Sequence, residues 1–155
     1  MKKIALFLSV VIATAMADTA AAKPDTLSID KTYYPGRRAF YELTPVKKHN
    51  IVMLGNSLTE RGLWGEYFQP AYVLNRGIGG DNVHGLYYRL HDDVYPYTPK
   101  RVFILIGING IEQEKQLIID RTRAVAQLIK ERGSEVWLGS ILPLRHPDAW
   151  DRFQY

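Results

Sequence analysis

The sequence predicts one α/β domain, a three-layer α/β/α fold with a parallel, flavodoxin-like sheet. Two observations support this class. Four short apolar runs, each ending at a small or polar residue, are typical of strands buried on both faces of a parallel sheet. Helical patterns lie between runs, so the chain order is β-α-β-α-β-α-β, which folds through right-handed crossovers. The 155 residues, 46% of them hydrophobic, suffice for one domain and exclude a disordered chain.

The expected strands come directly from the apolar runs. The stretch after the fourth run, Ile141 to Tyr155, carries no further strand or helix pattern, so the last strand would lack its closing crossover helix. We therefore expect the C-terminal part of the domain to be missing from this chain. In chain order the expected strands are Ile51–Leu54, Tyr72–Leu74, Val102–Ile106 and Val136–Leu138.

The clearest expected helix runs from about Glu112 to Arg132. It has acidic residues in its first turn, basic residues in its last, and Gly133 where a terminating glycine belongs. A second helix is expected over Asn82–Asp93 and a short one around Arg38–Leu43. The inward side chains at 3–4 spacing would be Leu117, Ile118, Val125, Leu128 and Ile129 on the first, and Val83, Leu86, Tyr87 and Leu90 on the second.

The N-terminus has the order of a secretory signal. Two lysines follow Met1, an uncharged apolar stretch runs from Ile4 to Ala15, and Ala15-Met16-Ala17 offers the small residues that signal peptidase reads. The alternative is a buried N-terminal helix. We expect residues 1–17 to be a signal peptide cleaved near Ala17 or Ala22, residues 18–49 an N-terminal approach segment, and residues 50–155 a partial catalytic-type domain. The mature protein would then be periplasmic or secreted.

Composition excludes several classes of function. The chain has no cysteine, which removes disulfides, thiolate zinc sites, a cysteine nucleophile and a lipid-anchored cysteine. The four histidines form no H-x-x-x-H pair, so no metal and no other cofactor is expected. The net charge of +4 is not clustered, so no nucleic-acid partner is expected. The apolar stretch is too short to span a bilayer, so no stable membrane anchor is expected.

Three segments that follow strands carry the candidate chemistry: residues 55–59, 75–81 and 107–109. Carboxyl ends of parallel strands meet at one edge of the sheet, where ligands bind. Ser57 offers a hydroxyl at a strand-to-helix turn, Gly80 lets a backbone N–H approach a ligand, and Asn109 offers a carboxamide N–H. One nucleophile with such donors is the arrangement of an acyl-transfer site with an oxyanion hole.

These residues resemble the blocks of the SGNH hydrolases, also called GDSL esterases. Gly55-Asn56-Ser57-Leu58-Thr59 resembles Gly-Asp-Ser-Leu-Thr, Asn75 to Gly80 resembles Asn-x-Gly-x-x-Gly, and Gly107-Ile108-Asn109-Gly110 resembles Gly-x-Asn-Asp. The resemblance implies the family's α/β/α fold. It implies that Ser57 is the nucleophile and that the oxyanion donors are the amides of Ser57 and Gly80 and the side chain of Asn109. It implies an ester as substrate.

The chain departs from the family pattern at three places. Asn56 stands in place of Asp, and its Oδ1 can still accept a hydrogen bond that braces the turn. Gly110 stands in place of an Asp that would brace the Asn109 loop. The family's Asp-x-x-His block near the C-terminus, which supplies the general base and its Asp, is not found there, since Asp148 is followed three residues later by Asp151. Of the four histidines only His146 lies on a strand-exit loop, where it is either an exposed loop residue or a substitute base.

The leading hypothesis is therefore an exported serine esterase of SGNH type that hydrolyses acetyl or acyl esters, on carbohydrates or lipids. The alternative is a truncated or degenerate SGNH-like domain that binds an ester or glycan without turnover. A third hypothesis is a flavodoxin-like nucleotide-binding module. Gly77-Ile78-Gly79-Gly80 imitates a dinucleotide fingerprint, but it follows the second strand, and its third glycine would fall on Asn82.

Overall fold

A computed structural model describes residues 33–45, 50–68, 72–110 and 115–141 of the chain. The expected signal peptide and His146 lie outside these residues. So do the first residues of the helix expected from Glu112. The structure therefore describes the sheet, the helices around it and the three strand-exit segments.

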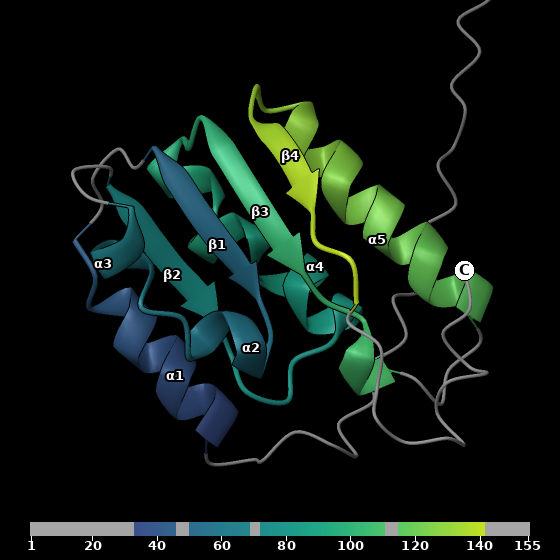
Figure 1. The fold of residues 1–155 in the computed structure, drawn as a ribbon, viewed down its shortest axis with the longest axis horizontal. Helices are drawn as coiled ribbons and strands as arrows, with labels where there is room; N and C mark the ends of the chain where they lie inside the picture. Colours follow the sequence, from purple (N-terminus) through teal and green to yellow (C-terminus); the bar gives the residue numbers. More distant parts are fainter. Residues whose placement is uncertain (1–32, 46–49, 69–71, 111–114, 142–155) are drawn as a thin grey trace, which may run out of the picture.

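Four parallel strands form a single sheet in the order β2-β1-β3-β4, and their arrowheads point the same way in Figure 1. In the register of the sheet, the last residue of β1, Gly55, lies opposite Gly77 of β2 and Leu105 of β3. The carboxyl ends of these three strands are therefore level at one edge, which confirms the expected fold class. The strands are β1 (Ile51–Gly55), β2 (Val73–Gly77), β3 (Arg101–Leu105) and β4 (Glu135–Leu138).

The helices lie on both faces of the sheet. Short α2 and α3 lie in front of β1 and β2 in Figure 1, and α4 lies behind. Helix α1 packs beside β2, where the Tyr41 hydroxyl donates to the carbonyl of Gly77. The helices are α1 (Tyr33–Glu42), α2 (Ser57–Glu60), α3 (Trp64–Tyr67), α4 (Val83–Asp93) and α5 (Lys115–Lys130), with 3-10 turns η2 (Tyr95–Tyr97) and η3 (Ile108–Gly110).

The core lies between the sheet and helices α4 and α5. Alternate residues of the strands point into it, as the two-residue period of a strand requires. Every third or fourth residue of the two helices meets them, and each fully buried aliphatic side chain contributes about 1.5–3 kcal/mol. The fully buried members include Val52, Leu54, Val102, Ile104, Val83, Leu86, Leu90, Val125 and Ile129.

Two side chains expected to point inward are exposed instead. Tyr87 of α4 is 51% exposed and Leu117 of α5 is 38% exposed. Tyr87 follows Leu86 directly, and one step along a helix turns a side chain through 100°, away from the core stripe. Leu117 lies in the first turn of α5, whose buried residues begin at Val125.

The fourth strand was expected to be buried on both faces, and this prediction is wrong. Trp137 and Leu138 of β4 are 51% and 55% exposed. Among the described residues, β4 is an edge strand that pairs only with β3. On one face Trp137 stacks on Phe103, with ring centroids 5.7 Å apart.

Strand β2 is longer than its apolar run. The run ends at Leu74, but the strand continues through Asn75 and Arg76 to Gly77. Polar Asn75 ended the apolar pattern, and the charged residue after it is buried inside the strand, with Arg76 only 1% exposed. The polar partners that make this burial possible belong to the site described next.

Candidate active site

Ser57 is the first residue of α2, directly beyond the carboxyl end of β1. Asn56 caps this helix, with an extended backbone and with Oδ1 accepting from the Leu58 N–H at 3.0 Å. The turn-bracing role expected of Asn56 is thus confirmed. Its own N–H donates to the carbonyl of Leu105 at 3.4 Å, which ties the serine turn to the end of β3.

Gly80 lies in a turn that runs from Ile78 to Asp81. The Asp81 N–H donates to the carbonyl of Ile78 at 3.2 Å and closes this turn. Gly80 is its third residue and has φ +77°, the value that a type II turn has at this position and that a side chain disfavours. No acceptor for the N–H of Gly80 or of Ser57 is found among the described residues. Both amides are therefore suited to donate to a ligand.

Asn109 lies in the 3-10 turn after β3. Its Nδ2 donates to the backbone carbonyl of Asp81 at 2.8 Å. A carboxamide has two N–H donors, so one remains for a ligand. Gly110 was expected to leave this loop without its brace, but the carbonyl of Asp81 orients Asn109 directly, and the Gly110 N–H closes the turn onto Gly107 at 3.2 Å.

The three strand-exit segments lie together at the carboxyl edge of the sheet. The Ile78 N–H donates to the carbonyl of Gly55 at 3.0 Å, which joins the Gly80 segment to the Ser57 segment. The bond from Asn109 to Asp81 joins the third segment to the second. The expected convergence of these segments on one sheet edge is therefore present. The catalytic roles of their residues remain predictions.

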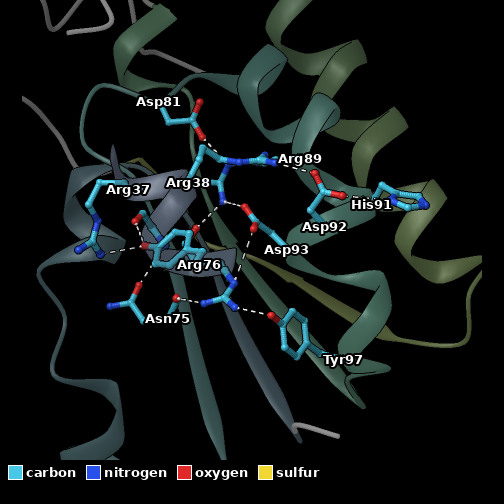
Figure 2. Close-up of polar contacts among 12 residues, drawn as sticks. Arg37, Arg38, Asn75, Arg76, Asp81, Arg89, His91, Asp92, Asp93 and Tyr97 are labelled. Carbon is cyan, nitrogen blue, oxygen red and sulfur yellow. Dashed lines mark hydrogen bonds and ion pairs between the residues drawn. The ribbon is translucent and has the colours of Figure 1, made fainter. Parts of the chain in front are cut away.

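A buried arginine forms hydrogen bonds to the residues at this edge. Arg89 of α4 is 0% exposed, and Figure 2 shows it between Asp81 and Asp93. Its Nε donates to Asp81 Oδ2 at 2.8 Å, and Nη1 donates to Asp93 Oδ2 at 2.8 Å. Nη1 and Nη2 also donate to the carbonyls of Arg76 and Gly55, at 2.8 and 2.9 Å. One side chain thus joins the ends of β1 and β2 to the residue that orients Asn109.

A second buried arginine, Arg76, extends the same network. Its Nη2 donates to the Tyr97 hydroxyl at 2.7 Å, and its Nε lies 3.7 Å from Asp93 Oδ1. The guanidinium also lies over the rings of Tyr41 and Tyr97, 4.4 and 4.9 Å from their centroids. Two arginines and two aspartates balance in charge, so the network can be buried at moderate cost.

The charges of this network are set by burial and by pairing. Burial raises the pKa of the Asp81 carboxyl, and the ion pair and hydrogen bond with Arg89 oppose that rise. Burial by itself would lower the pKa of Arg89, but Asp81 and Asp93 raise it above its ordinary value. Arg89 therefore stays charged, and the hydrogen bonds that it donates to the strand ends are charge-assisted.

Sequence reasoning missed this network. Four charged residues, Arg76, Asp81, Arg89 and Asp93, were not singled out. The four-residue spacing of Arg89 and Asp93, on the face of α4 that also carries Leu86 and Leu90, was the available signal.

No base for Ser57 is found among the described residues, where no histidine or carboxylate is hydrogen-bonded to its hydroxyl. His84 is half-buried at the start of α4, with Nδ1 2.7 Å from Arg121 Nη1. His91 is exposed and lies beside Asp92. His49 and His146 lie outside the described residues. The described part of the chain also contains no group of three His, Asp or Glu side chains that could hold a metal ion.

Comparison with curated proteins finds relatives over about two thirds of the chain. The chain is 30% identical over 110 residues to the platelet-activating factor acetylhydrolase IB subunit alpha1 of Bos taurus, covering 66% of this chain and 47% of that protein. The Homo sapiens protein matches at the same identity, with 48% of its length covered. This chain thus spans about half the length of the curated relatives that it matches. No protein-family model matches it.

Several solved structures have a fold similar to that of this chain. A GDSL-like lipase from Bacteroides thetaiotaomicron aligns with a TM-score of 0.60 at 22% identity, covering 79% of this chain and 64% of that one. An acetylxylan esterase from Geobacillus stearothermophilus aligns with a TM-score of 0.56 at 18% identity, covering 71% and 69%.

A parallel α/β/α fold with a serine turn, a glycine turn and an asparagine loop at one sheet edge is the arrangement that the resemblance to the SGNH hydrolases predicts. The comparisons of sequence and fold support the SGNH hydrolase, or GDSL esterase, family for this chain. Its relatives are ester hydrolases.

Proposed function

We propose that the protein is a serine esterase of SGNH type in which Ser57 is the nucleophile. The observation that carries the proposal is the shared edge. Ser57 begins α2 there, the Gly80 turn is hydrogen-bonded to β1, and Asn109 is oriented by the next residue after Gly80. This places a hydroxyl, two backbone donors and a carboxamide donor around one region, as acyl transfer requires.

In the proposed reaction the Ser57 Oγ attacks the carbonyl carbon of an ester. The negative charge that forms on the carbonyl oxygen is held by the amides of Ser57 and Gly80 and by Nδ2 of Asn109. The alcohol then leaves with a proton, and an acyl group remains on Ser57. Water attacks this acyl group and releases the acid. Serine needs a base within hydrogen-bond reach for this attack, and the proposal assigns none to the described residues.

For the substrate we propose a short acyl ester, with acetyl the first candidate. The curated relatives are named acetylhydrolases, and one of the structures with the same fold is named an acetylxylan esterase. These names support an acetyl group and leave the alcohol open between a lipid and a carbohydrate. The described residues contain no helix long and apolar enough to cross a membrane.

The nucleophile can be tested without fast turnover. A fluorophosphonate reacts when the serine oxygen attacks phosphorus and fluoride leaves, and the adduct is stable. We expect prolonged incubation followed by peptide mass spectrometry to find the adduct on Ser57. Ser57→Ala should abolish it. Ser140→Ala should leave it unchanged, because Ser140 is an exposed serine that follows β4. An adduct distributed over several serines, or none, would count against the assignment.

A non-catalytic role as an ester- or glycan-binding domain is the second candidate. The missing Asp-x-x-His block favours it. A binding protein of this kind would take up an acetylated ligand without forming an adduct at Ser57. Binding measured by ligand-observed NMR, together with an unlabelled Ser57, would decide for this candidate.

We also propose that the protein is exported. The order of lysines, apolar stretch and Ala-x-Ala at the N-terminus supports it. The expected result is a periplasmic or secreted product whose N-terminus, read by mass spectrometry, is Asp18, or Lys23 if the second site is cut. Ala17→Glu and Ala15→Glu together should block cleavage at the first site. A soluble product that retains Met1 would contradict export.

A further inference from the structure

Glu60 places a carboxylate against the glycine turn. It is the last residue of α2, three residues after Ser57. Its Oε2 accepts from the Gly79 N–H at 2.7 Å. Its Oε1 lies 2.7 Å from Nε of Arg37 and accepts from the Tyr33 hydroxyl. With 12% of its side chain exposed, Glu60 is held on three sides by groups from α1 and from the turn.

The bond to Gly79 restrains the Ile78-Gly79 peptide, which immediately precedes the amide of Gly80. Gly79 and Gly80 are the two central residues of the turn, and the Gly80 N–H belongs to the peptide that joins them. Such a peptide can turn over between type I and type II geometry, which reverses the direction of its N–H. A Cβ on Gly79 would lie 3.1 Å from Glu60 Oε2 and 3.1 Å from Tyr33 Cε1. The carboxylate therefore lies directly against the backbone of the turn.

We propose that Glu60 is a positioning residue: by accepting from the Gly79 N–H it fixes the first central residue of the turn, and so helps to hold the turn that presents the Gly80 N–H to an oxyanion. The role of that N–H rests on the proposed function, but the hold on the turn does not. Since Glu60 and Ser57 are both in the four-residue helix α2, one rigid unit positions the nucleophile and the turn together.

Arg37 balances the negative charge of the Glu60 carboxylate, which lies near the proposed oxyanion. A negative charge near a forming oxyanion would disfavour that oxyanion. The guanidinium of Arg37 lies beside Oε1 and balances the charge, while Oε2 remains on Gly79. An ion pair that merely joined α1 to α2 would not need the second oxygen to accept a backbone N–H of the turn.

The test measures the turn directly in the full chain by ¹⁵N relaxation and amide exchange. In Glu60→Ala we expect the Gly79 amide to exchange about 10- to 100-fold faster, because a charge-assisted bond is lost. We expect the order parameters of Gly79 and Gly80 to fall from about 0.85 to below about 0.6. Glu60→Gln should restore rigidity, since its amide oxygen can accept the same bond. Val52 and Ile104, in the core strands, should not change.

Arg37→Met is the matched control. It removes the ion pair but keeps the acceptor for Gly79, so Gly80 should stay rigid. Equal loosening in Arg37→Met and Glu60→Ala would overturn the proposal in favour of simple helix docking. A rigid Gly80 in Glu60→Ala would overturn it too.

If Glu60→Ala does not fold, the native chain provides the measurement. The amide proton shift of Gly79 should follow the same pH curve as the side-chain carboxylate carbon of Glu60. Independent curves would overturn the proposal. Because none of these readouts needs catalysis, a Glu60-dependent turn in a protein whose Ser57 fails to label would reject the proposed function alone.

Discussion

Replacing Arg89 by methionine is expected to lower the free energy of unfolding by about 3–5 kcal/mol, as when one partner of a buried ion pair is removed. The variant would leave the carboxylates of Asp81 and Asp93 buried without their shared cation. It would also remove the donors to the carbonyls of Gly55 and Arg76. Since domains of this size are stable by about 5–15 kcal/mol, a large part of the stability depends on this one side chain. Urea unfolding followed by circular dichroism measures the loss.

Arg101→Met is the matched control for this prediction. Arg101 also pairs with a carboxylate, Glu135, at 2.8 Å, but both side chains are more than half exposed. An exposed pair contributes at most about 1 kcal/mol. The prediction is wrong if the two variants lose stability equally. Adding Asp81→Asn to Arg89→Met should cost less than Asp81→Asn costs alone, because the charge it removes no longer has its partner.

The sheet could be predicted because runs of apolar residues indicate its strands. β1 and β3 are nearly continuous apolar runs, and each of their predicted bounds lies within one residue of the bound in the structure. Two strands in the middle of a parallel sheet are covered on both sides, so nearly every position selects an apolar residue. The parallel order follows from the helical segments between them.

Strands β2 and β4 show where that reasoning stops. Asn75 and Arg76 follow the apolar run of β2, yet both lie in the strand. The charge of Arg76 is met by Asp93 and by the rings of Tyr41 and Tyr97. Those partners come from α4, α1 and η2, far away in the sequence. For β4 the error was the opposite one: the apolar run predicted burial, but Trp137 is exposed. An edge strand can carry an exposed apolar side chain without any change in its local sequence pattern.

Some residues of the candidate site could likewise be predicted from the sequence, and others could not. Ser57, Gly80 and Asn109 were found because each follows a strand in a short block whose chemistry is local. The cap by Asn56 was also predictable, since a helix start needs an acceptor for its first amides. Arg89 and Glu60 act across more than one element. Their contacts with Gly55 and Gly79 depend on how α4 and α2 pack, which no local pattern specifies.

The 155-residue chain is expected to hydrolyse p-nitrophenyl acetate poorly or not at all. The proposed oxyanion donors are present, but residues 139–155, which follow the fourth strand, carry no Asp-x-x-His block to take the proton of Ser57. In triad enzymes, donors and binding without the base retain about 10³–10⁴-fold over the uncatalysed reaction. Ser57→Ala should therefore change the measured rate little in this chain. Steady-state release of p-nitrophenol gives both rates.

A longer form that carries Asp-x-x-His after Tyr155 should differ sharply. The reading frame beyond the codon for Tyr155 is the first place to look for that block. With a base within reach of Ser57 Oγ, we expect kcat/KM to rise by about 10⁴–10⁶-fold, which is the scale of loss when a triad base is removed. Ser57→Ala should then abolish the gain, and Asn109→Ala should reduce it by about 10²–10³-fold, the effect of one lost oxyanion donor. Robust turnover by the 155-residue chain would show instead that the base lies within it. His146→Ala would then be the first variant to test, because in the sequence His146 is the histidine that follows the fourth apolar run.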